Sequence, residues 1–378
     1  MKKILFLVKG SGMGLYIHQL RGWPKFAYDD SEILPLLSHA RNLQGRLMGK
    51  MEAIGFDLQS AAVLNTLTLD VLKTSEIEGE YLDQHLVRSS IAQKLGVDIG
   101  GSLKLDRNID GVVEMMLDAT QNYQEPLTHE RLFMWHKWLF PSRPSGLHRM
   151  TVGAYRTGSN GPMQVVSGAI GRETVHFEAP DAALISREME VFLEWFNSDE
   201  TPDQVLKAAM AHLWFVTIHP FSDGNGRIGR ALTDMLLARS DSSSQRFYSL
   251  SASIRIDRKN YYEILEKTQR GSLDITEWMV WFLLCLLNSL KLTEINLSLV
   301  FAKVNFWKKH AETILSERQK LIINKVLDGF EGKLTSEKYA KIGKCSKDSA
   351  VRDLNDLIAK NVFTKSDSGG RSTSYLLV

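Results

Sequence analysis

The sequence has little cysteine and no apolar segment long enough to cross a membrane. Only two cysteines, Cys285 and Cys345, occur among 378 residues. Two cysteines so far apart form neither a disulfide framework nor a metal motif, and they suit a reducing compartment. The most apolar segment, Trp278 to Leu290, is too short to span a bilayer and predicts a buried core helix. The apolar run at the N-terminus stops at Lys9, and no signal-peptide cleavage site follows it. We therefore expect a cytoplasmic protein without a membrane segment.

The chain also lacks an excess of either charge. Lysine and arginine number 46, and aspartate and glutamate number 44, so the formal net charge is +2. A nearly balanced charge implies no global attraction to nucleic acid or to an anionic membrane. The length suffices for two or three domains with buried cores.

One stretch, residues 219–230, combines several chemically distinct side chains within twelve positions. It reads His-Pro-Phe-Ser-Asp-Gly-Asn-Gly-Arg-Ile-Gly-Arg. Apolar residues at three- and four-residue spacing predict helices on both sides, over 208–218 and 231–238. Because proline and glycine interrupt that pattern, the middle is expected to be a tight loop.

A Gly-Asn-Gly turn at the start of a helix exposes backbone N–H groups at the positive end of the helix dipole. Such a turn predicts an anion site, and phosphate is the obvious anion. Arg227 and Arg230, three residues apart, can fork onto phosphate oxygens. Asp223 offers a hard oxygen ligand for Mg²⁺, and His219 offers a base near neutral pH. The alternative is a loop that merely closes a helical hairpin, with solvated arginines and a core histidine.

This stretch resembles the signature of Fic-domain proteins, His-Pro-Phe-x-Asp/Glu-Gly-Asn-Gly-Arg-x-x-Arg, and every fixed position matches. The resemblance implies a mainly α-helical protein with a Fic-fold core that transfers AMP from ATP to a Tyr, Thr or Ser hydroxyl of a target protein and of itself. His219 would be the catalytic base, and Asp223 would hold Mg²⁺. The residues implied to bind the ATP phosphates are Gly224, Asn225, Gly226, Arg227, Gly229 and Arg230. Within that set the Asn225 amide is expected to add a donor, and Arg227 and Arg230 are expected to meet the β- and γ-phosphates.

A second short pattern lies upstream, in Thr74-x-x-x-Glu78-Gly79. Its plain interpretation is the end of a helix that began near Phe56, with Gly79 close to a C-terminal cap. It also matches the Ser/Thr-x-x-x-Glu-Gly/Asn inhibitory motif of Fic proteins with an N-terminal inhibitory helix. The resemblance implies that Glu78 pairs with Arg230 and blocks the γ-phosphate. In some family members this glutamate activates water to remove AMP, so reversal of AMPylation stays open here.

Two further parts of the site are predicted less directly. Short β-prone pieces at 163–166 and 173–176 predict a β-hairpin. Its place resembles the Fic flap, where a target segment adds as a strand against Val165, Val166 and Ser167. His176 and Glu178 are expected to close that hairpin without a catalytic role. Further on, Tyr261 and Tyr262 either wall an adenine pocket or are ordinary packing residues.

Four parts of the chain are expected: an extension or linker at 1–14, an N-terminal helical domain with the inhibitory motif at 15–105, the catalytic core at 106–295, and a separate unit at 312–378. Helical spacing predicts helices over 31–49, 56–72, 108–120, 128–139, 182–196, 202–218 and 256–270. The last unit, with three helices and a terminal hairpin, resembles a winged helix. Its would-be recognition helix, over 347–361, carries Lys347 and Arg352 but also Asp348, Asp353 and Asp356. Protein contact or homodimerisation therefore stays open beside DNA binding.

Three rival functions remain open at this stage. The same fold can transfer UMP, phosphate or phosphocholine, although Asp223 and the Gly-Asn-Gly turn favour a nucleotide. The chain could instead be a DNA-binding regulator whose site senses nucleotide. It could also be the toxin half of a toxin–antitoxin pair, although the built-in Glu78 argues against the need for a separate antitoxin.

Overall fold

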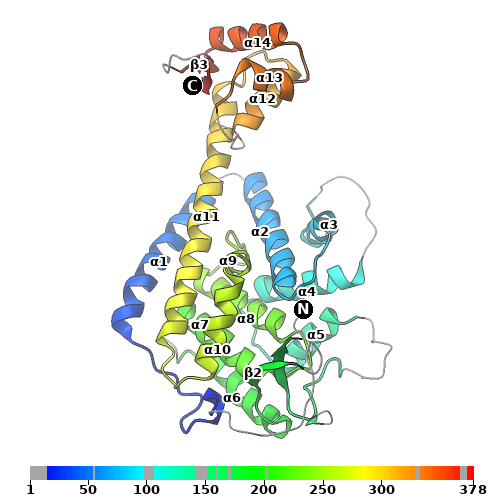
Figure 1. The fold of residues 1–378 in the computed structure, drawn as a ribbon, viewed down its shortest axis with the longest axis vertical. Helices are drawn as coiled ribbons and strands as arrows, with labels where there is room; N and C mark the ends of the chain where they lie inside the picture. The colour runs from blue at the N-terminus through cyan, green and yellow to red at the C-terminus, as the bar shows by residue number, and fades with distance from the viewer. Residues whose placement is uncertain are drawn as a thin grey trace. The chain divides into compact units, whose positions relative to one another are not determined.

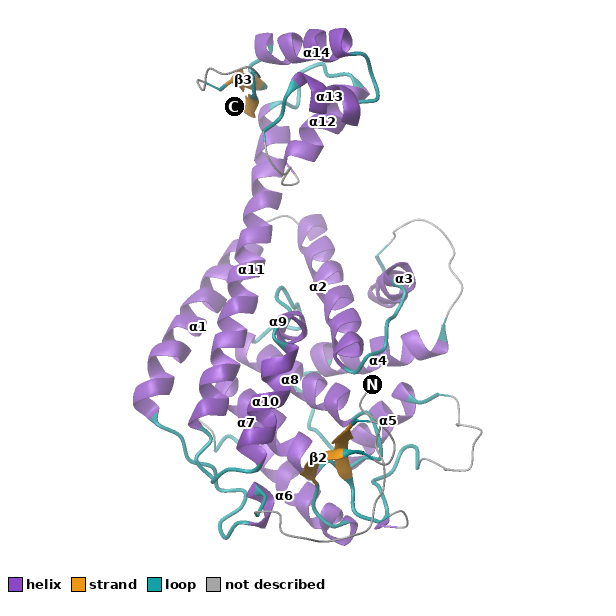
Figure 2. Cartoon of the chain, in the orientation of Figure 1, coloured by secondary structure: helices purple, strands orange, loops and turns teal. Residues whose placement is uncertain are grey.

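The computed structural model describes residues 15–53, 56–97, 106–141, 151–158, 161–168, 172–200, 203–327, 333–366 and 373–378. Within them the chain is mainly α-helical, as expected, and carries two short two-stranded sheets (Figure 2). It divides into two compact units, Met1–Lys291 and Leu292–Val378 (Figure 1). The extension predicted at 1–14 lies outside the described residues. The division into four parts remains a prediction.

The first half of unit 1 is helical, and side chains start most of its helices. The elements are η1 (Ile17–Gln19), α1 (Asp30–Glu52), α2 (Phe56–Ile77), α3 (Gln84–Leu95), α4 (Arg107–Gln121) and α5 (His129–Leu139). Asp29, Asp106 and Thr128 each accept a hydrogen bond from a backbone N–H in the first turn of α1, α4 and α5, which satisfies donors that the helix leaves free.

The second half of unit 1 begins with the predicted hairpin. Strands β1 (Gln164–Ser167) and β2 (Thr174–Glu178) pair antiparallel, with an irregularity between Val165 and Val166. This confirms the hairpin. Then follow η3 (Ala182–Leu184), α6 (Ile185–Asn197), α7 (Gln204–Ile218), α8 (Asn225–Asp241), α9 (Leu250–Ile256), α10 (Arg258–Gln269) and α11 (Thr276–Lys309).

Helix α7 is the buried centre of unit 1. Almost every residue from Val205 to Ile218 is buried, so its sequence shows no polar face. It packs against α8, and the Trp278 Nε1–H of α11 donates to the Ala209 carbonyl at 2.8 Å. The motif therefore connects two central helices and rests on a rigid base.

Helix α11 is longer than expected. Its first part is the predicted apolar core helix, but the helix continues to Lys309 rather than ending near residue 290. Among the described residues, Thr276–Ile295 alone is long and apolar enough to cross a membrane by length and composition, with a mean hydropathy of 1.4. Of that window 56% is buried inside the protein, which is typical of a core helix.

The described residues of unit 2 contain the end of α11, up to Lys309, followed by three helices and a hairpin in the predicted order. They are α12 (Glu317–Leu327), α13 (Ser336–Ile342), α14 (Lys347–Ala359), β3 (Phe363–Lys365) and β4 (Tyr375–Leu377). A core of its own, with Ile322, Tyr339 and Leu354 fully buried, holds these elements together. The order confirms the predicted elements, and the comparison with a winged helix stays an interpretation.

Candidate active site

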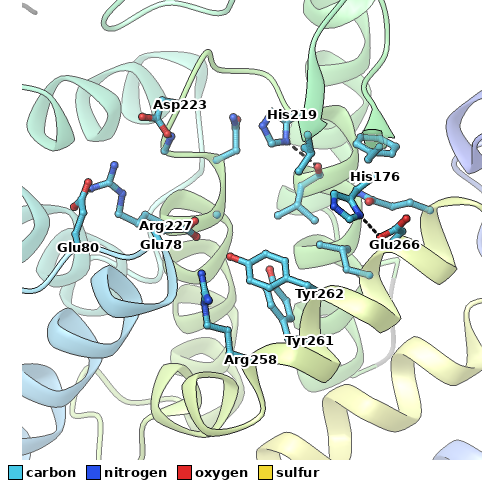
Figure 3. Close-up of a pocket in the computed structure, with 18 residues that line it drawn as sticks. Glu78, Glu80, His176, His219, Asp223, Arg227, Arg258, Tyr261, Tyr262 and Glu266 are labelled. Atoms are coloured by element: carbon cyan, nitrogen blue, oxygen red, sulfur yellow. Dashed lines mark hydrogen bonds and ion pairs between the residues drawn. The ribbon is translucent and has the colours of Figure 1, made fainter. Parts of the chain in front are cut away.

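The motif loop lies beside a cavity of about 330 Å³ in unit 1 (Figure 3). One end of this cavity, here called the phosphate end, is formed by residues 223–227 with Glu78 and Glu80. The other end, here called the flap end, is formed by Val165, His176 and Phe177 of the hairpin together with residues of α10. The residues that line the cavity are Glu78, Glu80, Val165, His176, Phe177, Val216, His219, Asp223, Gly224, Asn225, Gly226, Arg227, Arg258, Tyr261, Tyr262, Leu265, Glu266 and Gln269.

His219 ends α7 in a conformation that non-glycine residues rarely adopt, with φ 53° and ψ 56°. Such backbone strain persists only where the surroundings hold it. Arg156 supplies much of that support. Its Nε donates to the His219 carbonyl at 2.8 Å, its backbone N–H donates to the Pro220 carbonyl at 2.9 Å, and its Nη2 donates to the Pro180 carbonyl at 2.5 Å.

The ring of His219 presents one nitrogen to the cavity as a base. Nδ1 lies 3.2 Å from the Val216 carbonyl, and since a carbonyl only accepts, Nδ1 carries the proton and Nε2 keeps its lone pair. Burial lowers the pKa of His219 to about 4, the Val216 carbonyl raises it, and Arg156 lowers it further. The imidazole is therefore neutral at physiological pH. A bound polyphosphate would raise this pKa, because a nearby anion favours the imidazolium.

The phosphate end has the geometry of an anion site. Gly224, with φ 78°, caps the start of α8, so the first N–H groups of the helix face the cavity. The Asp223 carboxylate accepts from the Gly224 N–H at 2.6 Å and is solvent-exposed. The Asn225 amide binds the backbone of Phe221 with its Oδ1 at 2.9 Å and its Nδ2 at 2.8 Å. Asn225 thus shapes the loop, and the phosphate contact predicted for its amide stays a prediction.

Both motif arginines are paired with carboxylates from the end of α2. Arg230 Nη2 lies 2.7 Å from Glu78 Oε1, as predicted from the sequence. Its Nε donates to Thr74 Oγ1 at 2.7 Å, so Thr74 and Glu78 hold the same guanidinium. Arg227 Nη1 lies 2.7 Å from Glu80 Oε2, a pair that the sequence did not suggest. Arg227 Nε is buried and has no hydrogen-bond acceptor among the described residues.

Glu78 is ionised in this arrangement. Burial raises its pKa, but Arg230, with Arg227 and Arg258, outweighs burial and holds the pKa below its usual value. The carboxylate also sits directly on the α8 turn. A Cβ at Gly226 would lie 2.2 Å from Glu78 Oε1, so a larger residue at this position would displace the carboxylate. Gly229 has a different role, because it faces Val216 of α7 and does not line the cavity.

The two predicted tyrosines line the cavity and also make structural contacts. Thr233 Oγ1 donates to the Gly229 carbonyl at 2.8 Å, so it accepts from His212 Nδ1 at 2.9 Å. His212 Nε2 then accepts from the Tyr261 hydroxyl at 2.9 Å. Burial lowers the pKa of His212 to about 3. Tyr262 donates to the Ile77 carbonyl at 3.4 Å at the end of α2. The adenine contact predicted for both tyrosines stays a prediction.

Polar contacts also build the flap end. His176 Nδ1 lies 2.6 Å from Glu266 Oε2 of α10, and His176 Nε2 lies 2.5 Å from Ser167 Oγ. Arg270 donates to the Val175 carbonyl at 2.7 Å and to the His176 carbonyl at 3.0 Å. Of the predicted docking residues, Val165 reaches the cavity, the Val166 side chain is buried, and Ser167 binds His176.

Sequence reasoning missed several residues of this site: Glu80, Arg156, His176, Arg258, Glu266 and Gln269. His176 was noted as a hairpin residue only, yet it lines the cavity. One signal was present for Glu80, because it follows Gly79 directly in the inhibitory pattern. The others carry no local signal.

The donor set at the phosphate end limits the kind of metal site. The described residues hold no group of three or more His, Cys, Asp or Glu side chains that could form an all-protein metal site. Asp223 is a single exposed carboxylate next to the anion turn. That fits Mg²⁺, which is commonly held by one or two carboxylates together with substrate phosphates.

Two family models match unit 1. Residues 126–237 match the Fic/DOC family, and residues 16–97 match a domain of unknown function (DUF4172). The chain is 30% identical over 200 residues to a protein adenylyltransferase Fic of Culex quinquefasciatus, which covers 52% of this chain and 36% of that protein. It is 28% identical over 101 residues to a probable protein adenylyltransferase of Aquifex aeolicus, which covers 27% of this chain and 29% of that protein. The chain thus spans only about a third of these curated relatives.

A solved structure extends the likeness of fold to nearly the whole chain. The crystal structure of a Fic family protein from Desulfovibrio desulfuricans G20 matches with a TM-score of 0.51 at 19% identity. The match covers 92% of this chain and 96% of that one. It supports the Fic-fold assignment and carries no information on substrates.

Proposed function

We propose that this chain, which contains a Fic domain at residues 126–237, is a protein adenylyltransferase that moves AMP from ATP to a Tyr, Thr or Ser hydroxyl of a protein, itself included. The observation that carries the proposal is the phosphate end of the cavity. There a neutral histidine, a helix N-terminus and Arg227 line one space, and Glu78, which also lines it, pairs with Arg230. The names of the curated relatives support the same reaction class.

His219 is the general base of the proposed reaction. The target hydroxyl gives its proton to Nε2 while its oxygen attacks the α-phosphorus, and pyrophosphate leaves with the electron pair of the broken bond. The Nδ1–H bond to Val216 keeps the correct tautomer. Arg156 keeps the strained backbone of His219 in place, so the ring is oriented before the substrate arrives.

The phosphate end binds and orients the triphosphate. Backbone N–H groups of Gly224, Asn225 and Gly226 face the phosphates, Arg227 takes the β-phosphate and Arg230 takes the γ-phosphate. Asp223 would hold Mg²⁺, which when bound neutralises charge on the leaving pyrophosphate. Tyr261 and Tyr262 line the same cavity, and in the proposal they wall the adenine.

Glu78 inhibits this site in the proposal. With its carboxylate 2.7 Å from Arg230 Nη2, one donor that the γ-phosphate would use is occupied, and a negative charge stands in the phosphate's place. Removal of AMP by water that Glu78 activates belongs to the same proposal, since the ionised carboxylate lines the cavity together with His219.

The proposal also covers the setting of the protein. We propose a cytoplasmic enzyme whose partner is a target protein, with unit 2 as a winged-helix-like module for protein contact or homodimerisation. On α14, the acidic residues Asp353 and Asp356 bind Arg318 and Lys360 within unit 2. That arrangement does not favour DNA over a protein partner.

The test uses the full chain and two forms of ATP, labelled on the α- or the γ-phosphate, with Mg²⁺. Transfer of the α-label alone to protein, mapped to a hydroxyl side chain, is the expected result. Transfer of the γ-label would mean phosphorylation instead. No protein-bound label from either form, in wild type or in Glu78→Gly, would overturn the proposal.

A further inference from the structure

We propose that Glu80 guards the β-phosphate position of the cavity as a second carboxylate, separate from Glu78 at the γ-phosphate position. The resting pocket would then discriminate among nucleotides by their number of phosphates. This inference rests on the proposed function. Its starting point is the ion pair between Glu80 Oε2 and Arg227 Nη1 at 2.7 Å (Figure 3).

The end of α2 is built to present both carboxylates to the motif. The helix ends at Ile77, and the N–H groups of Glu78 and Glu80 both donate to the Ser75 carbonyl, at 3.1 and 3.0 Å. Gly79 turns the chain with φ 88°, a conformation that favours glycine. This tight turn points residues 78 and 80 at neighbouring arginines of one helix.

Contacts from α10 hold this end of α2 in place. Arg258 Nε donates to the Ile77 carbonyl at 2.7 Å, and Tyr262 donates to the same carbonyl at 3.4 Å. Since both Arg258 and Tyr262 line the cavity, the segment with Glu78 and Glu80 is fixed by groups of the site itself.

Arg227 has the character of a ligand-binding arginine rather than of a surface ion-pair partner. Its side chain is 4% exposed, whereas that of Glu80 is 49% exposed. The guanidinium also lies over the Phe140 ring, at 5.2 Å from its centroid. Its Nε is buried without an acceptor among the described residues, so the fork has a free donor for a second anion beside Glu80.

The two pairs differ in how firmly they are made. Glu78 is 31% exposed and binds an Arg230 that Thr74 also holds, whereas Glu80 is 49% exposed. Water and salt weaken an ion pair more when its carboxylate is more exposed, as that of Glu80 is. The β-phosphate should therefore displace Glu80 more easily than the γ-phosphate displaces Glu78, which admits nucleotides with fewer phosphates first.

The test measures binding of AMP and of α,β-methylene analogues of ADP and ATP by calorimetry, because the methylene bridge prevents transfer. The charge-neutral variants are Glu80→Gln and Glu78→Gln. Glu76→Gln is the matched control, since Glu76 binds Lys73 and Arg255 and not the motif. We expect Glu80→Gln to tighten both analogues about 3- to 10-fold and Glu78→Gln to tighten mainly the ATP analogue. AMP should bind all variants alike.

Two outcomes overturn the inference in different ways. If Glu80→Gln binds the ADP analogue no better than Glu76→Gln does, Glu80 is only a surface carboxylate, and the proposed enzyme stands without it. If none of the three nucleotides binds even the Glu78→Gln/Glu80→Gln double variant, the nucleotide site itself falls, and the proposed function falls with it.

Discussion

The two ends of the cavity are built in different ways. At the phosphate end, most groups come from twelve consecutive residues and the carboxylates from one neighbouring turn, with Arg227 and Arg230 nearly inaccessible. At the flap end, His176 and Glu266 are 90 positions apart in the chain and partly exposed. The phosphate end thus depends mainly on one short segment of the sequence, whereas the flap end depends on the packing of the hairpin against α10.

The largest expected effect is at the phosphate end. In a Glu78→Gly background, His219→Ala should lower AMP transfer by about 10²- to 10⁴-fold, because a general base lowers the barrier by that factor. Nucleotide affinity should stay within a few-fold, since the base does not hold the ground state. Initial rates with α-labelled ATP measure the loss of transfer, and calorimetry measures the nucleotide affinity. Undiminished transfer would remove His219 from the mechanism.

Acid should weaken the support behind the phosphate end. The pKa of His212 falls from 6.5 to about 3 on burial, so the unfolded chain binds more protons than the folded one at intermediate pH. Its contribution is complete above pH 6.5 and is lost as pH falls toward 3. Between pH 7 and 5 the loss should be about 2 kcal/mol.

Urea unfolding at both pH values measures this loss. His212→Asn should show a flatter pH dependence than wild type, because asparagine does not titrate. Burial also lowers the pKa of His18, His136 and His219 to about 4. These three residues are present in both proteins, so their contributions cancel in the comparison. If wild type and His212→Asn lose the same stability between pH 7 and 5, the lowered pKa of His212 is contradicted.

Arg156 joins the two ends, because it binds the His219 carbonyl and also the Pro180 carbonyl just after β2. Arg156→Lys should lower kcat about 10-fold and leave KM for ATP within about threefold, since a misplaced base costs rate rather than binding. Arg239→Lys is the matched control. Arg239 also binds backbone carbonyls but lines a separate cavity. Equal kcat in the two variants would reduce Arg156 to a structural residue.

The smallest effect is expected at the flap end. Glu266→Gln removes the partner of His176, whose side chain is 23% exposed, so stability should fall by less than about 1 kcal/mol. We expect AMP transfer to fall only about 2- to 5-fold. Glu263→Gln, on the same helix and paired with Lys259 in solvent, should change neither. If Glu266→Gln lowers AMP transfer more than 10-fold, the flap end takes part in catalysis, and the contrast between the two ends is wrong.

The same contrast explains how much the sequence could predict. The motif and its flanking helices were predictable because their signals are local: apolar spacing, Gly224 and the charges lie within a few turns. The pair of Glu78 and Arg230 was predictable only through family resemblance, because 152 positions separate them. Nothing local marks Arg156, whose partners lie 24 and 63 positions away.

Some helices were not predicted although the sequence carries signals for them. Helix α3 was not predicted, although Asp83 caps its first turn and Gly96 ends it with φ 69°. Helix α9 was not predicted either, although Ser249 accepts from the Ala252 N–H at its start. The extension of α11 to Lys309 was missed because Lys291, Thr293 and Glu294 interrupt the continuous apolar run, whereas the helix continues.

The central claim is that Glu78 holds a competent phosphate end closed, and one variant tests it most directly. If the pair with Arg230 closes the site 99% of the time, Glu78→Gly should raise incorporation of α-labelled AMP by up to about 100-fold. Arg230→Ala in the same background should cancel much of that gain, because the γ-phosphate then loses its donor. Initial rates at matched folded concentration give the result. Unchanged or lower incorporation in Glu78→Gly would contradict the account, and residues 74–79 would then be only the end of a helix.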